Sequence, residues 1–221
     1  MWGAVAVLVS IANGSTAAAD APRDVGFEPS VHVGVGTFPS HLIFDGSPAW
    51  APGRRNAAAG VHLDLAYRFA PLVDGGLHVF HQWLVVDGVD ANSESTASGA
   101  GILGRLHPLT ALWPRFPLDL SLGIGLDFFA SARQTTEPRP PSTTPESRQS
   151  VPGFAMPVWL GLDVLIGDVA VGLVGIWTLW WRVEECSSVG TGLPECRRVS
   201  SAPIQYLFLG LGVRLHLEFV Q

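Results

Sequence analysis

The sequence contains no lysine, and charged residues of every kind are few. All 13 basic residues of the 221-residue chain are arginine, and charged residues make up 14%, against about 25% in ordinary soluble domains. The mean hydropathy is +0.31, so little polar surface is available to cover a water-facing domain. The net charge of −6 comes without a basic run. We therefore expect neither a nucleic-acid partner nor a polybasic membrane-surface helix.

Cysteine is scarce as well. Cys186 and Cys196 are the only two, and they lie in the segment EECSSVGTGLPEC, which is rich in Gly, Ser and Pro and is therefore a loop. In an oxidising compartment the pair predicts a disulfide that closes a short loop, whereas in the cytosol both would be free thiols. Two cysteines without a nearby histidine do not form a zinc site.

The N-terminus is typical of a secretory signal. An apolar core over 2–12 is followed by turn-forming residues and by small residues at Ala17 and Ala19, although no Arg or Lys precedes the core. The pattern predicts a signal peptide over 1–19 and a mature domain over 20–221.

The most apolar stretch, 158–181, reads VWLGLDVLIGDVAVGLVGIWTLWW and is long enough to cross a membrane as a helix. Such a helix would place two aspartates at bilayer depth, at a cost of a few kcal/mol each. The apolar residues instead alternate, on even positions up to Ile166 and on odd positions from Val169. Period two is typical of strands. The stretch therefore predicts two strands joined by a tight turn at 167–168.

Further segments alternate in the same way. The faces of 77–86 are ambiguous, because His81 falls on the more apolar face. Short connections alternate with long polar ones, including 183–203 and 131–152, whose run RQTTEPRPPSTTPESRQS is typical of disorder. Together with the two strands of the apolar stretch, which extend over 154–166 and 169–182, eight strands are predicted. The other six are 31–38, 61–69, 77–86, 98–107, 117–129 and 206–219.

The predicted fold is all-β: an eight-stranded antiparallel transmembrane β-barrel of up-and-down topology. Residues 26–221 resemble the small outer-membrane barrels of the OmpA, OmpX and OmpW type in strand count, loop alternation and a last strand with an aromatic, Phe219, near its end. The resemblance implies a monomer in the bacterial outer membrane, with outer-membrane lipid and the barrel assembly machinery as partners and long loops available to an extracellular partner.

A soluble lipocalin-like barrel also alternates, but there the polar face meets water. Here that face consists mostly of Gly, Ala and Ser, which suit a narrow lumen better than an aqueous surface. The Leu- and Val-rich face is therefore expected to contact lipid, with aromatic residues near both ends of the strands as interfacial girdles.

Inward charges are predicted to cluster in the periplasmic half of the lumen, joined by His107 and His216. They should pair, because an unpaired charge there costs several kcal/mol. The expected role is a plug, and the alternative is a gate whose pairs exchange. The predicted charge network comprises Asp64, Arg68, Arg105, Asp119, Asp163, Arg214 and Glu218.

The predicted function is a structural or surface-interaction role, without enzymatic activity, cofactor or metal site. The alternative, an OmpW-like channel for small hydrophobic molecules, would use an apolar lumen pocket. A lipid A-modifying enzyme is a minor alternative, since Ser121, His107 and Asp119 form no motif. His32, His62 and His78 are scattered over three strands. The candidate pocket residues are Phe80, Trp159, Ile176 and Phe208.

Overall fold

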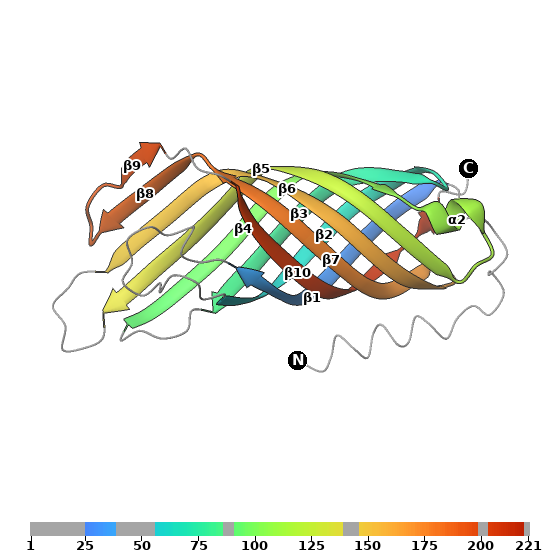
Figure 1. The fold of residues 1–221 in the computed structure, drawn as a ribbon, viewed down its shortest axis with the longest axis horizontal. Helices are drawn as coiled ribbons and strands as arrows, with labels where there is room; N and C mark the ends of the chain where they lie inside the picture. The colour runs from blue at the N-terminus through green and yellow to red at the C-terminus, as the bar shows by residue number, and fades with distance from the viewer. Residues whose placement is uncertain (1–24, 39–55, 86–90, 139–145, 199–202, 219–221) are drawn as a thin grey trace.

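The computed structural model describes residues 25–38, 56–85, 91–138, 146–198 and 203–218. These residues form a long, closed β-barrel with a flap of sheet that extends beyond one end (Figure 1). The predicted signal peptide lies outside the described residues. No helix in the described part of the chain is long and apolar enough to cross a membrane. The barrel strands are β1 (Gly26–Phe38), β2 (Asn56–Ala70), β3 (Val73–Val85), β4 (Ala91–Leu106), β5 (Leu118–Pro138), β6 (Ser147–Ile166), β7 (Val169–Arg182) and β10 (Ile204–Leu215).

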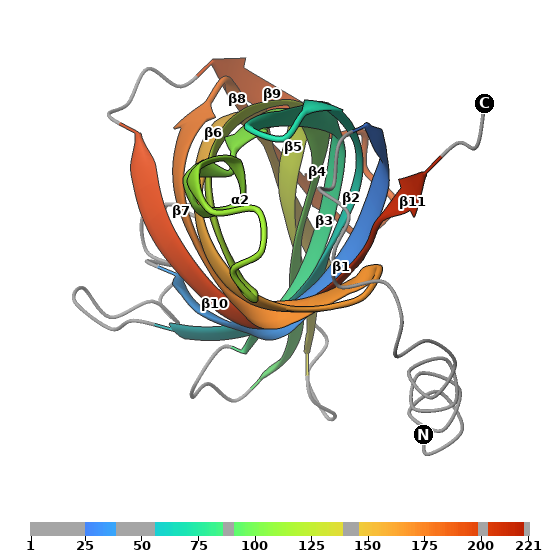
Figure 2. The same cartoon turned by 90° about the vertical axis from the view of Figure 1, so that its right-hand side faces the viewer.

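Each barrel strand pairs antiparallel with its neighbours, so the wall is closed all the way round (Figure 2). The first and last long strands meet in register, with Val33 opposite Leu211. The two-residue strand β11 (Leu217–Glu218) adds to the end of β1. The prediction of an eight-stranded up-and-down barrel is confirmed. So is the interpretation of the apolar stretch as two strands, since β6 and β7 pair across a turn in which Gly167 has φ 57°.

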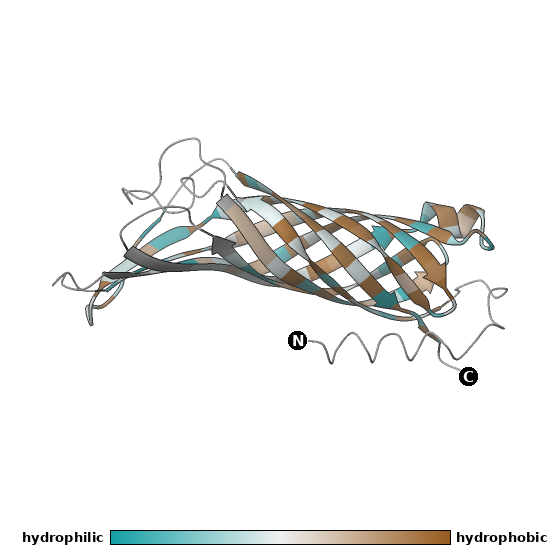
Figure 3. Cartoon of the chain, turned by 90° about the horizontal axis from the view of Figure 1, so that it is seen from below, coloured by the Kyte–Doolittle hydropathy of each residue, from teal (hydrophilic) through white to brown (hydrophobic). Residues whose placement is uncertain are grey.

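The two faces of the wall separate as predicted. On β2, Leu63 and Leu65 are 46% and 50% exposed, whereas the alternate residues His62 and Asp64 are buried inside. Figure 3 shows the resulting checkerboard of hydrophobic and paler residues along the wall. The structure resolves the faces of the segment 77–86, which the sequence left ambiguous. His81 lies on the outward face of β3 and hydrogen-bonds the Ser98 hydroxyl at 2.7 Å. His78, Phe80 and Gln82 point inward.

A β-bulge on β5 reverses the parity of that strand. Phe128 and Phe129 are both exposed, at 52% and 78%, and the register with β6 shifts between Asp127 and Ala130. Odd residues therefore point inward before the bulge, and even residues such as Ala130 point inward after it. A bulge adds one residue to one strand only, so a strictly alternating pattern predicts the wrong face beyond Phe128.

Aromatic side chains lie at both ends of the outward face. At the end that holds the short turns, Tyr67 contacts Phe27 and Phe69, with both pairs of ring centroids 5.2 Å apart. At the other end, Phe154 and Trp181 stack at 5.1 Å. The predicted positions near both strand ends are thus observed, and such pairs of belts are typical of barrels at the two membrane interfaces. Phe219 lies outside the described residues.

The connections hold more regular structure than predicted. The segment 131–152, predicted as a disordered loop, largely continues β5 and β6, and 183–203 contains the hairpin of β8 (Glu184–Val189) and β9 (Glu195–Arg198). The connection 108–117 contains the short helix α2 (Pro108–Leu112). The outer part of β6 and the strands β8 and β9 are rich in polar residues and show no alternation of apolar residues. They are recognised as strands only from the pairing of β6 with β8 and of β8 with β9.

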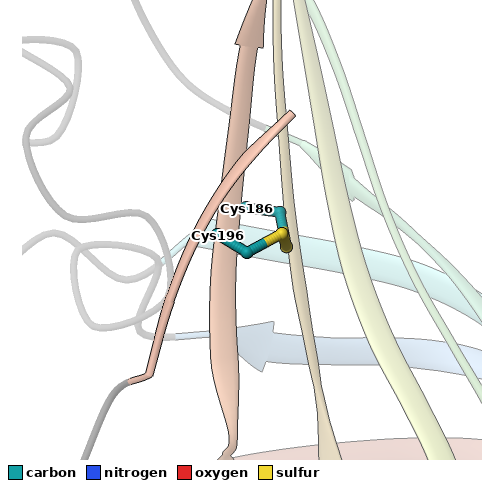
Figure 4. The surroundings of a disulfide bond; sticks show 2 residues. All are labelled: Cys186 and Cys196. Carbon is teal, nitrogen blue, oxygen red and sulfur yellow. A yellow bond between two sulfur atoms is a disulfide. The ribbon is translucent and has the colours of Figure 1, made fainter. Parts of the chain in front are cut away.

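The predicted disulfide is confirmed. Cys186 on β8 and Cys196 on β9 are directly opposite in register, and their Cα atoms are 4.1 Å apart (Figure 4). The bridge ties the two strands of the outer hairpin together.

The pairing of β5 with β6 is interrupted in the outer part of the wall, close to Phe154. Partner pairs occur at Ile124–Val158 and at Asp127–Ala155, whereas the two positions between them, where Met156 and Pro157 lie on β6, carry none. Pro157 has no N–H to donate to a ladder. This segment of the wall is therefore held by fewer backbone hydrogen bonds than its surroundings.

Glycines on β4 and β5 leave room for large rings inside the barrel. A Cβ atom on Gly125 would lie 2.8 Å from the Trp159 ring and 2.7 Å from the Ile102 carbonyl oxygen. A Cβ atom on Gly99 would lie 2.3 Å from the Phe80 ring. The glycine-rich inner face is thus the surface onto which the lumen aromatics pack.

We expect Gly125→Val to lower the free energy of unfolding by about 1–3 kcal/mol, the usual cost of overpacking. Chemical unfolding in detergent micelles, followed by tryptophan fluorescence, measures the change. Gly104→Val is the control on the neighbouring strand, because a Cβ there meets nothing closer than 3.9 Å. Equal effects of the two substitutions would contradict the assigned close packing.

Candidate functional site: the interior charge network

The most distinctive group of side chains lies inside the barrel at the end with the short turns. Seven strands or their ends contribute to it, because each presents alternate residues to the narrow lumen. Every residue of the group except Asp163 is at most 5% exposed. This interior charge network consists of Glu28, Asp64, Arg68, Asp74, Arg105, His107, Asp119, Asp163, Arg214 and His216.

Arg105 joins two carboxylates on neighbouring strands. Its Nε donates to both oxygens of Asp74 at 3.1 Å, and its Nη1 donates to Asp64 Oδ2 at 3.0 Å. A planar guanidinium suits such forked contacts with carboxylates. Arg105 thereby ties β4 to both β2 and β3.

Arg214 on β10 holds the opposite side of the network. Its Nη2 donates to Asp163 at 2.9 Å and also to Asp119, while its Nη1 lies 3.4 Å from Glu28 Oε2. Arg68 completes this side, with its Nε 2.9 Å from Glu28 Oε1. Three strands that are remote in the sequence, β1, β5 and β6, are thus bound to β10 by one side chain.

His107 connects the two sides. Its Nε2 lies 2.9 Å from Asp74 Oδ2, and its Nδ1 lies 2.7 Å from Asp119 Oδ2. The network contains five carboxylates and three guanidiniums, and His107 bridges two of these carboxylates.

The helix α2 closes the network at the barrel end. It lies over one side of the open end of the barrel in Figure 2. The buried Thr110 hydroxyl donates to Asp119 Oδ1 at 2.7 Å. A segment predicted only as a connection therefore supplies a cap for the lumen.

Toward the middle of the barrel the charged groups give way to histidines. Asp64 accepts a hydrogen bond from the Ser30 hydroxyl at 2.9 Å and lies 3.2 Å from His32 Nε2 and 2.8 Å from His78 Nδ1. His62 follows on β2 and hydrogen-bonds Gln82 at 3.1 Å. Asp64 thus links the interior charge network to a layer of aromatic side chains nearer the middle of the barrel.

The predicted apolar lumen residues form that aromatic layer. The His62 ring packs against Phe208 and Phe80 with centroid distances of 4.4 and 5.5 Å, and the His78 ring contacts Trp159 at 4.9 Å. Phe208, Trp159 and Ile176 belong to one buried cluster, and Phe80 belongs to an adjoining one. All four predicted residues are at most 2% exposed, so their side chains occupy the lumen.

The structure brings together six of the seven predicted charged residues and places the seventh at the rim. Glu218 has a 53% exposed side chain, with Oε1 3.6 Å from His216 Nε2, because it follows β10 at the end of the barrel. Two members were missed by sequence reasoning. Glu28 lies before the predicted start of the first strand, and Asp74 lies in a predicted turn. In both strands the inward parity continues through these residues, which could have identified them.

The network does not fit a metal ion. One carboxylate or imidazole atom from each of Glu28, Asp74 and His107 lies within 4.8 Å of the others. Arg68 and Arg105, however, already contact the two carboxylates, and a cation would compete with these guanidiniums. The second geometric group, Glu184 with Cys186 and Cys196, contains disulfide sulfurs rather than thiolates.

The residues of the minor enzymatic alternative are not arranged as a nucleophile and its base. Both nitrogens of His107 face carboxylates, and the Ser121 hydroxyl is placed against Gly161, where a Cβ atom would lie 2.3 Å from it. Without a free imidazole nitrogen, His107 cannot accept a proton from Ser121.

Comparison with known proteins gives a fold and no family. No protein-family model matches the chain, and no curated protein matches it in sequence. Among solved structures, the chain is similar to a major outer membrane protein from Thermus thermophilus, with a TM-score of 0.56, 11% identity and coverage of 87% of this chain and 99% of that one. It is also similar to the outer membrane protein OprG from Pseudomonas aeruginosa, with a TM-score of 0.50, 13% identity and coverage of 87% and 97%.

We expect Arg214→Ala to lower the free energy of unfolding by about 3–5 kcal/mol, because it removes a guanidinium partner from three carboxylates inside the barrel, Glu28, Asp119 and Asp163. Unfolding in detergent micelles measures the loss. Arg148→Ala is the control, since its ion pair with Glu146 is exposed and worth about 0–1 kcal/mol. A change as small as that of the control would contradict the structural role of Arg214.

The closed antiparallel barrel agrees with these comparisons. The chain therefore has the fold of the small eight-stranded outer-membrane β-barrel proteins.

Proposed function

We propose that this protein resides in the bacterial outer membrane as a closed barrel with a structural or surface-interaction role. The predicted signal over 1–19 would direct export, and the domain over 20–221 would be inserted as a monomer by the barrel assembly machinery. The outward row of exposed apolar side chains, such as Val33 at 60% and Leu211 at 66%, suits contact with lipid.

The main support for a closed lumen is that its charged side chains are shielded from solvent. Arg68 is 0% exposed, Asp74 1% and Arg214 3%. An aqueous path through this end would leave at least some of these groups accessible to water. The pairing network and the aromatic layer above it support a plug rather than a pore, in line with the little room that eight strands leave.

The outer end supports the surface role. β5 and β6 continue past the barrel wall and carry the disulfide-linked hairpin of β8 and β9 (Figure 1). Such a paired, covalently tied sheet presents a fixed polar surface outside the membrane, where an extracellular partner can reach it.

Planar-bilayer recording tests the plug. We expect neither the native protein nor Arg214→Ala to give large stepwise currents, because the other pairs and the aromatic layer still fill the lumen. A porin of known conductance, reconstituted in the same way, controls for insertion, and heat-modifiable gel mobility controls for folding. A large open channel in either protein would contradict the proposal.

The runner-up function is passage of small hydrophobic molecules through the lumen and out through the wall. The interrupted β5–β6 ladder at Pro157 favours it, because Trp159 and Gly125 lie in contact just inside that place. Uptake of a small apolar dye into proteoliposomes separates the two functions. Uptake above that of empty vesicles, without conductance, would favour lateral passage, and uptake equal to that of empty vesicles would favour the plug.

A further inference from the structure

The outer flap of sheet carries a regular array of polar side chains on one face. The register aligns residues of β5, β6 and β8 in lateral rows, and every second row shares a face. We call this array the outer polar grid. It consists of Arg133, Ser150 and Cys186 in one row and Thr135, Arg148 and Ser188 in the other.

The outer polar grid borders a concave site. A pocket of about 560 Å³ is lined by the six grid residues together with Gln134, Glu146, Gln149, Ser187 and Pro194 of the β8–β9 hairpin, and the Glu146 carboxylate in it is paired with Arg148. Three strands spaced about 4.8 Å apart and two rows separated by two residues give a floor of roughly 10 by 7 Å. That floor matches one or two sugar rings rather than a protein surface.

The grid continues the lipid-facing wall beyond the outer aromatic belt. Phe129 and Arg133 lie on the same face of β5, and Phe154 and Ser150 lie on the same face of β6. Four residues of strand separate the members of each pair, which corresponds to about 13 Å along the strand. If the aromatic rings mark the edge of the hydrocarbon, the grid lies at the level of the outer lipid headgroups.

The chemistry of the grid suits a ligand that has both hydroxyl and acidic groups. Arg148 donates from Nε to the Glu146 carboxylate at 2.6 Å, which leaves its other nitrogens free to donate. Arg133 makes no ion pair with any residue that the structure describes. Guanidinium forks bind phosphate and carboxylate, and the hydroxyls of Ser150, Ser188 and Thr135 can exchange hydrogen bonds with sugar hydroxyls.

The pocket is held in shape by its surroundings. Cys186 forms part of the floor, and its disulfide to Cys196 fixes the hairpin that carries Pro194. A fixed site loses less conformational entropy when it binds.

We propose that the outer polar grid binds an acidic sugar, meaning a hydroxyl-rich saccharide that bears a phosphate or carboxylate. This inference rests on the proposed surface role and names the chemistry of the partner. The ligand could be the headgroup of an outer-leaflet glycolipid or a free saccharide, and Arg133 and Arg148 would hold its acidic group in either form.

The test uses the full-length protein in nanodiscs or proteoliposomes. The soluble probes are glucose 6-phosphate, glucose and inorganic phosphate, measured by calorimetry, and the lipid probe is a lipopolysaccharide-containing nanodisc compared with one of phosphatidylcholine alone. The variant is Arg133→Gln combined with Arg148→Gln. Arg115→Gln is the matched control, because Arg115 is exposed at the opposite end of the barrel. Heat-modifiable mobility verifies that each variant folds.

We expect the affinity for the sugar phosphate or for the lipopolysaccharide nanodisc to fall roughly tenfold or more in the double variant. The reason is the loss of charge-assisted hydrogen bonds. The affinity of Arg115→Gln should stay unchanged. Binding confined to the lipid probe identifies a headgroup, and binding of glucose 6-phosphate identifies a free saccharide. Absence of binding to every probe, or equal binding by all variants, would overturn the grid proposal. The plug is judged separately by conductance, which these variants should not alter.

Discussion

A charge inside a closed eight-stranded barrel has little water to solvate it, and the rest of this structure depends on that constraint. The lumen is filled by the side chains of its own wall, so each inward guanidinium must find carboxylates on other strands. Arg105 does so on the two strands before its own, and Arg214 binds β10 to strands that are distant in the sequence. The same pairs that neutralise the interior therefore also fix the relative positions of the strands.

The sequence predicts the wall well because the two faces of each strand meet different solvents. Leu63 and Leu65 face outward and Asp64 faces inward, and this alternation is readable without a structure. Prediction from this alternation fails where a bulge breaks the period, as at Phe128 and Phe129. It also fails where a strand extends beyond its run of alternating apolar residues, so that Glu28 and Asp74 were missed. The side-chain partners themselves depend on register, which the sequence pattern does not specify.

Outside the membrane no lipid contacts the outer face, so apolar and polar residues have no reason to alternate along a strand. Beyond the outer aromatic belt both faces of β5 and β6 are free to be polar, so their extensions resemble disordered loops in composition. Pairing with β8, and the disulfide between β8 and β9, hold these extensions in a sheet. The barrel thus changes from a lipid-facing wall to a polar surface along the same strands, which places the outer polar grid about 13 Å along the strands beyond the outer aromatic belt.

The central claim is that the charged lumen is closed to water, and the exchange of arginine Nε–H protons with solvent tests it most directly. NMR of the folded protein in detergent or lipid can compare Arg68, Arg105 and Arg214 with Arg115, which is exposed. Protons that are buried away from water exchange only when the surrounding structure opens. The three interior arginines should exchange far more slowly than Arg115. Exchange of all four at similar rates would contradict a sealed interior and would indicate a water-filled path.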